Sequence, residues 1–95
     1  MELINEKLIA KEDIGKLHFN RSEVLRSEEA IRKRRADLYR AMILGNAYHT
    51  KVKIEFAAKE GKNCVETTVW HASDADIALK GGAIIPVCCI TSVTF

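Results

Sequence analysis

The sequence predicts an α+β protein, with N-terminal helices packed on a small five-stranded antiparallel, barrel-like sheet. Three observations lead to this prediction. Apolar residues recur at helical spacing in the first half of the chain, and they alternate with polar residues in the second half. Glycine-containing turns then divide the second half into short strands. With 95 residues the chain fits one domain, 1–95, with a helical part over 1–46 and a β part over 47–95.

Two helical segments are expected before residue 47. Residues 2–13 place their apolar side chains on one side of a short helix. A longer helix is expected over residues 21–44, because Asn20 is a good N-cap and Glu23 stands three residues later, as in a capping box. Both segments are expected to contribute apolar side chains to the core.

The length of the second helix leaves two alternatives open. Gly45 is expected to end it, since glycine tolerates the left-handed conformation that follows many helices. A continuous helix up to that point would be about 36 Å long, which is more than a small sheet covers. Either the helix breaks near Ser27, which is a suitable N-cap, or one end protrudes and needs a partner.

Strand periodicity begins after residue 50, where apolar and charged residues alternate. A hairpin loop centred on Glu60-Gly61 leads into a Val- and Thr-rich strand over residues 63–72. Pairing Phe56 with Val65 keeps the apolar face continuous, so this register is expected.

A second hairpin is expected at Gly81-Gly82, as a two-residue turn that places Leu79 opposite Ile84. Pro86 has no N–H to donate, so its strand must lie at a sheet edge or leave the sheet there. A last short strand follows, over residues 91–95.

The run Ile77-Ala-Leu-Lys-Gly-Gly-Ala-Ile-Ile-Pro-Val, followed by Ile90 and Val93, resembles the closing half of small SH3-like or Sm-like barrels. In such barrels a proline-containing turn often precedes the final strand. The resemblance covers residues 28–95 and extends to small bacterial proteins that end in a similar Lys-Gly-Gly…Ile-Pro segment. It implies a fold and transfers no functional residue, because the distinctive Sm-like RNA-binding motif and the aromatic SH3 groove are both missing.

The composition of the chain indicates which broad classes of protein to expect. The chain is 47% hydrophobic and 29% charged, which is typical of a folded protein, and no apolar run is long enough to span a bilayer. The mixed charges of the first 13 residues do not fit a signal peptide. Three cysteines, an odd number, suit reduced thiols. We therefore expect a cytoplasmic protein without membrane contact.

The densest candidate site is basic. Residues 1–47 hold ten Lys/Arg and eight Asp/Glu, so the net charge of +2 resides in the helical half. These side chains could contact phosphates. The alternative is a solvated helix face with Glu–Arg and Glu–Lys pairs at i,i+4 spacing. The basic candidates are Arg26, Arg32, Lys33, Arg34, Arg35 and Arg40.

A second candidate surface combines Lys51, Lys53 and Trp70, with His49 nearby. Lysines around a tryptophan on the wet face of a sheet could stack a nucleic-acid base or hold an acidic peptide. The alternative is that Trp70 packs under the N-terminal helix with the Lys51 stem along it.

No histidine or cysteine has the spacing of a zinc site, and no nucleophile or phosphate-loop motif is present. We expect no metal, no cofactor and no enzymatic activity. The expected function is a small binding module that binds nucleic acid weakly through its basic helix. The alternative is a protein-interaction module. A homo-oligomer, most simply a dimer through the helical half, is the expected assembly, and an acidic protein is a further expected partner.

Overall fold

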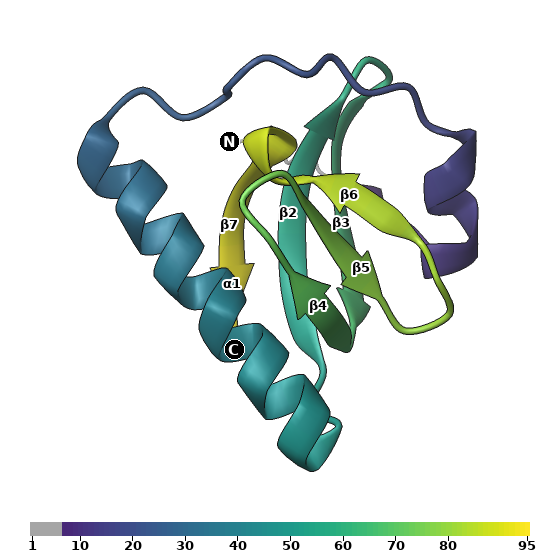
Figure 1. Ribbon diagram of the computed structural model, residues 1–95. Coiled ribbons are helices and arrows are strands. Elements are labelled where there is room, and N and C mark those ends of the chain that lie inside the picture. The colour runs from purple at the N-terminus through teal and green to yellow at the C-terminus, as the bar shows by residue number, and fades with distance from the viewer. Residues whose placement is uncertain (1–6) are drawn as a thin grey trace, which may run out of the picture.

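The computed structural model describes residues 7–95 and is an α+β structure with one long helix and seven strands in two sheets (Figure 1). The four-stranded sheet has the order β1-β3-β2-β7 and the three-stranded sheet the order β4-β5-β6. The β1–β3 pair is parallel and the other pairs are antiparallel. The strands are β1 (Lys7–Leu8), β2 (Val52–Ala58), β3 (Gly61–Thr67), β4 (Val69–Ala72), β5 (Asp76–Leu79), β6 (Ile84–Pro86) and β7 (Ile90–Thr94).

The expectation of five strands in one barrel-like sheet is wrong, since neither sheet closes into a barrel. The segment 63–72, expected as one strand, is interrupted at Thr68. Residues before Thr68 pair with β2, and residues after it pair with β5. The backbone carbonyl of Thr68 instead accepts a hydrogen bond of 2.9 Å from the N–H of Lys80. The chain thereby passes from one sheet to the other, so that both can bury an apolar face.

The short N-terminal helix expected over residues 2–13 is also wrong where the structure describes it; residues 2–6 lie outside the described part. Lys7–Leu8 forms β1 at the edge of β3, and the Ile9 N–H donates to the carbonyl of Cys64 at 2.9 Å. A 3₁₀ helix, η1 (Lys11–Lys16), follows and buries Ile14. Pairing with a distant strand here outweighs a weak local preference for helix.

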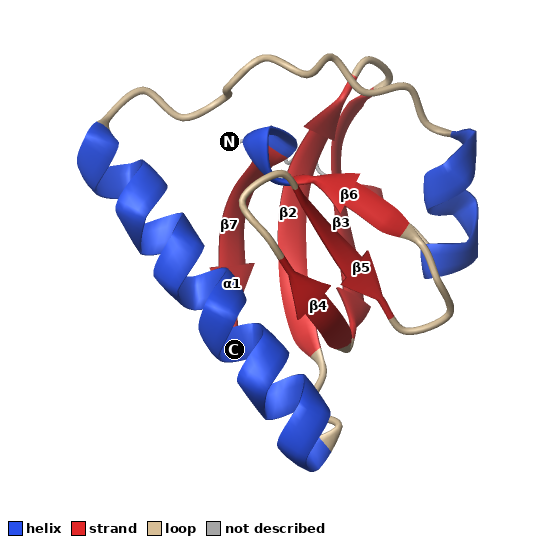
Figure 2. Ribbon diagram, in the orientation of Figure 1, coloured by secondary structure: helices blue, strands red, loops and turns tan. Residues whose placement is uncertain are grey.

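The long helix α1 (Glu28–Tyr48) begins after Ser27, not after Asn20. The Ser27 hydroxyl accepts a hydrogen bond of 3.1 Å from the Ala30 N–H, which confirms the alternative that the helix breaks near Ser27. Residues 17–26 form an irregular link that passes over the top of the sheets in Figure 2. The capping box is therefore not formed.

Gly45 lies inside α1, and the expectation that it ends the helix is wrong. The helix continues to Tyr48, where His49 takes the left-handed conformation with φ 57°. A side chain on Gly45 would collide with the carbonyl oxygen of Val69 and lie 2.9 Å from Cγ2 of Thr68. Glycine is thus required because α1 crosses β4 at close range.

The pairing register of the first hairpin differs from the expected register by two residues. Ile54 stands opposite Val65 and Phe56 opposite Asn63, with a loop of only Lys59 and Glu60. Because side chains alternate between the faces of a strand, a shift of two leaves the same residues buried.

The pairing register of the second hairpin differs from the expected register by one residue, because its loop has three residues, Lys80-Gly81-Gly82. Ile84 stands opposite Ala78, and Ile85 opposite Ile77. A shift of one exchanges the faces, so that Ile85 is buried and Ile84 is exposed. The N–H of Leu79 donates to the carbonyl of Ala83 at 2.8 Å, which fixes this register.

The end of the chain agrees with expectation. Pro86 is the last residue of β6, which lies at the edge of its sheet. A short 3₁₀ helix, η2 (Val87–Cys89), leads into β7, which returns to pair with β2.

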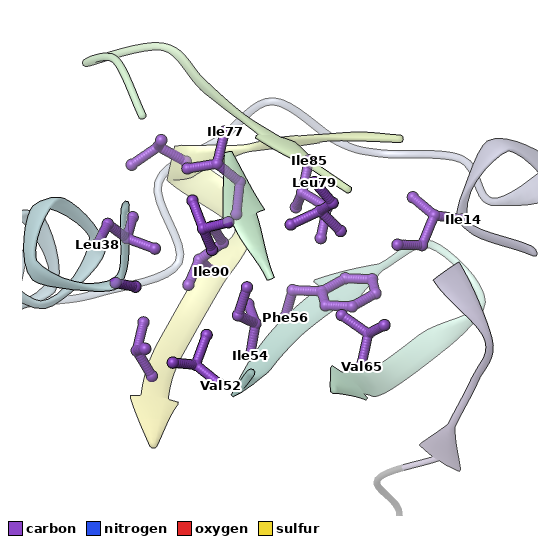
Figure 3. Close-up of a cluster of buried hydrophobic side chains, with 14 residues drawn as sticks. Ile14, Leu38, Val52, Ile54, Phe56, Val65, Ile77, Leu79, Ile85 and Ile90 are labelled. Atoms are coloured by element: carbon purple, nitrogen blue, oxygen red, sulfur yellow. The ribbon is translucent and has the colours of Figure 1, made fainter. Parts of the chain in front are cut away.

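The core lies between the two sheets (Figure 3). Leu38 of α1 lies at one end of the cluster and Ile14 of η1 at the other. The labelled side chains between these ends are Val52, Ile54, Phe56, Val65, Ile77, Leu79, Ile85 and Ile90.

In the described part of the chain, no helix is both long and apolar enough to cross a membrane.

Candidate functional site

Arg34, one of the basic candidates, is buried, and its side chain is only 5% exposed. Its Nη1 and Nη2 donate to the two carboxylate oxygens of Glu23 at 2.6 and 2.7 Å, and Nη1 also donates to the Ile90 carbonyl at 3.1 Å. The hydrogen bonds from Arg34 lower the pKa of Glu23. Arg34 therefore does not belong to the solvated helix face that was the alternative for the basic candidates. Its place in the middle of a basic run concealed its role.

The basic run spans residues 32–35. Its other three residues point outward, and each forms an ion pair. They fan around the helix, because consecutive helical residues are separated by about 100°. Such exposed pairs contribute little to stability. The three pairs are Arg32–Glu28 (3.8 Å), Lys33–Asp37 (2.7 Å) and Arg35–Asp74 (3.4 Å).

Arg40 and Arg26 lie apart from this run. The Arg40 guanidinium lies over the ring of Phe95, 4.5 Å from its centroid, in cation–π contact. Arg26 is exposed in the link before α1. Five of the six basic candidates therefore make different local contacts, and Arg34 among them is buried.

The candidate surface of Lys51, Lys53 and Trp70 is divided between the sheets. Lys53 belongs to β2 of the four-stranded sheet, whereas Trp70 belongs to β4 of the three-stranded sheet. The Trp70 ring is partly exposed and its centroid lies 6.1 Å from that of His49. The Trp70 carbonyl accepts from Asn46 Nδ2 at 3.0 Å, so the residue sits beside the last turn of α1. Lys51 is exposed just before β2.

A pocket of about 730 Å³ lies between α1 and the turn that joins β4 to β5. Sequence reasoning did not find it, because its walls come from four separate segments. Its lining combines the Arg34–Glu23 ion pair, in which Arg34 is buried and Glu23 is partly exposed, with apolar and exposed basic side chains. These are Glu23, Ile31, Arg32, Arg34, Arg35, Ala36, Leu38, Tyr39, Ala72, Ser73, Asp74 and Val87.

An apolar stripe runs along the solvent side of α1. It consists of Ala36, Tyr39, Ile43 and Ala47, all exposed, and we call it the outer face of α1. Tyr39 is 58% and Ile43 49% exposed. Residues at spacings of three and four share one side of a helix. This spacing is visible in the sequence.

Chemistry at the thiols is not favoured by the structure. Cys64 and Cys89 are buried, and Cys88 is partly exposed. Burial, followed by the neighbouring Cys88, raises the pKa of Cys89 to about 11. Within residues 7–95, no three His, Cys, Asp or Glu side chains converge as metal ligands would.

Comparison with protein-family models gives no match, and comparisons with curated proteins and with solved structures give none either. The functional proposals below therefore rest on the geometry of the described residues.

Proposed function

We propose that this protein is a non-enzymatic interaction module that associates with a second copy of itself, as a dimer, through the outer face of α1. The observation that carries the proposal is the exposed apolar stripe containing Tyr39 and Ile43. It lies opposite the buried side of the same helix, where Leu38 and Ala41 join the core. An antiparallel pair of such helices would cover both stripes and align their dipoles favourably.

The exposed area indicates a weak dimer. A large apolar or aromatic side chain carries roughly 200 Å² of surface, so the half-exposed Tyr39, Ile43 and nearby Phe95 offer about 300 Å² per protomer. A stable interface buries about 800 Å² per partner. We therefore expect association in the range of tens to hundreds of micromolar, roughly −5 to −6 kcal/mol.

Sedimentation velocity across a concentration series tests this proposal. Ile43→Arg is expected to abolish the concentration-dependent dimer, because a charge in the centre of the stripe cannot be covered by an apolar partner. Tyr48→Arg is the matched control, since Tyr48 is exposed at the end of α1 on another side of the helix. A wild-type protein that stays monomeric up to several hundred micromolar would contradict the proposal.

We also propose that the sheets are a variant of the SH3-like or Sm-like arrangement. The order Pro86, η2 and β7 supports this, because a proline-containing turn precedes the last strand in such folds. The return of β7 to β2 also supports it.

A second candidate function, weak and sequence-independent nucleic-acid binding, is favoured by one observation. The side chains of Arg32 and Arg35 are each 72% exposed, and Tyr39 projects one turn further along α1. Arginines beside an aromatic ring suit phosphates and an unstacked base. An acidic protein would meet the same charges. A cytoplasmic location fits this function and the odd number of cysteines.

The double variant Arg32→Glu/Arg35→Glu tests this second candidate, and Arg34 is left unchanged because it is buried. Binding to single-stranded RNA of any sequence should weaken, and the salt dependence should flatten. Equal binding by wild type and variant across a salt titration would remove the basic side of α1 from consideration.

A further inference from the structure

Arg34 retains hydrogen-bond donors that nothing in residues 7–95 accepts. A guanidinium has five N–H donors, and three of these are used by Glu23 and the Ile90 carbonyl. The Nε atom is buried and has no hydrogen-bond partner among the described residues. One N–H of Nη2 also remains. A buried N–H without an acceptor is unfavourable, so an acceptor at this position would stabilise the protein.

The Nε and Nη2 donors lie on one edge of the guanidinium, and this edge matches two oxygens of one acceptor group. Carboxylates bind arginine in this bidentate way. Arg34 also lines the pocket of about 730 Å³ beside α1. The volume lies within the range of small-molecule sites in proteins.

The walls of the pocket determine what else a ligand must carry. Ile31 and Leu38 of α1 face the pocket, as do Ala72 and Val87 from the other side. These side chains offer no hydrogen bonds, so they suit a hydrocarbon body. A ligand that fits both features has an apolar tail and a charged head.

The charges around the pocket select the head group. The lining holds three arginines and two carboxylates, which leaves one net positive charge. The Glu23 carboxylate is already bound to Arg34, and it would repel a dianion more strongly than a monoanion. A singly charged head group is therefore favoured over a phosphate.

We infer that this pocket binds a small apolar carboxylic acid, with the carboxylate on the Nε/Nη2 edge of Arg34 and the tail against Ile31 and Leu38. The Nε atom is covered by its neighbours in the structure. The exposed side chains of Arg35 and Tyr39 line the same pocket and can turn aside to admit the ligand. This site adjoins the proposed dimer surface, because Ala36 and Tyr39 belong to both, whereas Ile43 belongs to the outer face of α1 alone.

Octanoate is the probe, and octanol and octyl phosphate are the controls. The ligands are titrated into ¹⁵N-labelled protein, and the Arg34 Nε–Hε resonance is followed by NMR. Octanoate is expected to shift this resonance saturably and to slow its exchange with water. Octanol should bind at least about tenfold more weakly, because it lacks the ion-assisted hydrogen bonds. Tighter binding of octyl phosphate, or an Arg34 resonance that does not respond to octanoate, would overturn the inference.

Three variants separate the possible results. Arg34→Lys keeps the positive charge but loses the bidentate pair of N–H donors on the Nε/Nη2 edge. It is expected to weaken octanoate binding about tenfold or more. If this variant does not fold, Ile31→Ala serves instead, with a several-fold loss because the tail loses a contact. Ile43→Arg leaves the pocket lining intact and should bind octanoate at least as tightly as the wild type does. Unchanged affinity in both Arg34→Lys and Ile31→Ala would place the ligand elsewhere and refute the assignment.

Discussion

Arg34 in α1 and Glu23 in the preceding link are joined by two hydrogen bonds of 2.6 and 2.7 Å. The same carboxylate accepts from the backbone N–H of Leu25 at 2.9 Å. Glu23 therefore organises the link that precedes α1, in place of the capping box that its spacing from Asn20 predicts. Val24 continues this attachment, since its N–H donates to the Cys88 carbonyl at 3.0 Å.

Replacing Glu23 with glutamine is expected to destabilise the protein by about 2 kcal/mol, measured by urea unfolding at neutral pH. The variant leaves the buried Arg34 charge without its counter-charge. Breaking a fully buried ion pair typically costs about 3–5 kcal/mol. The loss of stability in Glu23→Gln is expected to be smaller, because the Glu23 side chain is 34% exposed. Arg32→Gln, at an exposed pair, is the control and should change stability by less than about 0.5 kcal/mol. Equal effects in both variants would mean that the Arg34–Glu23 pair is not structurally important.

The contribution of Glu23 to stability is expected to depend on pH in the acidic range. The hydrogen bonds from Arg34 lower the pKa of Glu23 from its ordinary value of 4.5. A lowered pKa in the folded state means that the contribution is complete above about pH 4.5, the unfolded value, and is lost as the pH falls through the folded value. The difference in unfolding free energy between wild type and Glu23→Gln should therefore shrink on acidification below that pH. A difference that is constant from pH 7 to pH 3 would contradict the assignment.

Gly45→Ala is expected to destabilise the protein by about 1–2 kcal/mol, although alanine is the better helix former by about 1 kcal/mol. The added methyl group would collide with the Val69 carbonyl, which belongs to the backbone and cannot rotate away. Gly15→Ala is the matched control, because nothing lies within 4 Å of the added carbon. Thermal unfolding measures both variants. A Gly45→Ala protein more stable than wild type would show that α1 and β4 are not in close contact.

Cys89 is expected to resist alkylation by iodoacetamide at pH 8 in the folded protein. Burial raises its pKa to about 11, so almost no thiolate is present at that pH. Cys88 is partly exposed and should react first. Peptide mapping of Cys88→Ala identifies any label on Cys89 without ambiguity, and the same reaction in urea is the control for reactivity. Rapid labelling of Cys89 in the folded Cys88→Ala variant would be inconsistent with its burial.

Several features of the protein follow from neighbouring residues and were predictable for that reason. Ser27 caps α1 through an N–H only three residues away. The alternation that begins at Val52 predicts β2 and its buried face, and a register error of two residues leaves that face unchanged. Pro86 ends β6 because of its own chemistry, whatever surrounds it.

Other features depend on contacts between distant residues, and no local pattern contains them. Lys7 becomes part of a strand because Asn63 lies beside it, and Thr68 divides a strand because Lys80 binds its carbonyl. Arg34 resembles its basic neighbours in the sequence, yet it is buried because Glu23 and Ile90 surround its guanidinium.

Local sequence patterns predict the division into a helical and a β half, the approximate positions of the two hairpins, and Ser27 as one of two candidate caps of the long helix. These depend on propensity, capping and periodicity, which act over a few residues. The two-sheet arrangement, the burial of Arg34 and the pocket beside it arise only from tertiary contacts. Each of these is stabilised by burial and hydrogen bonding between segments far apart in the chain, and such contacts exist only once the chain has folded.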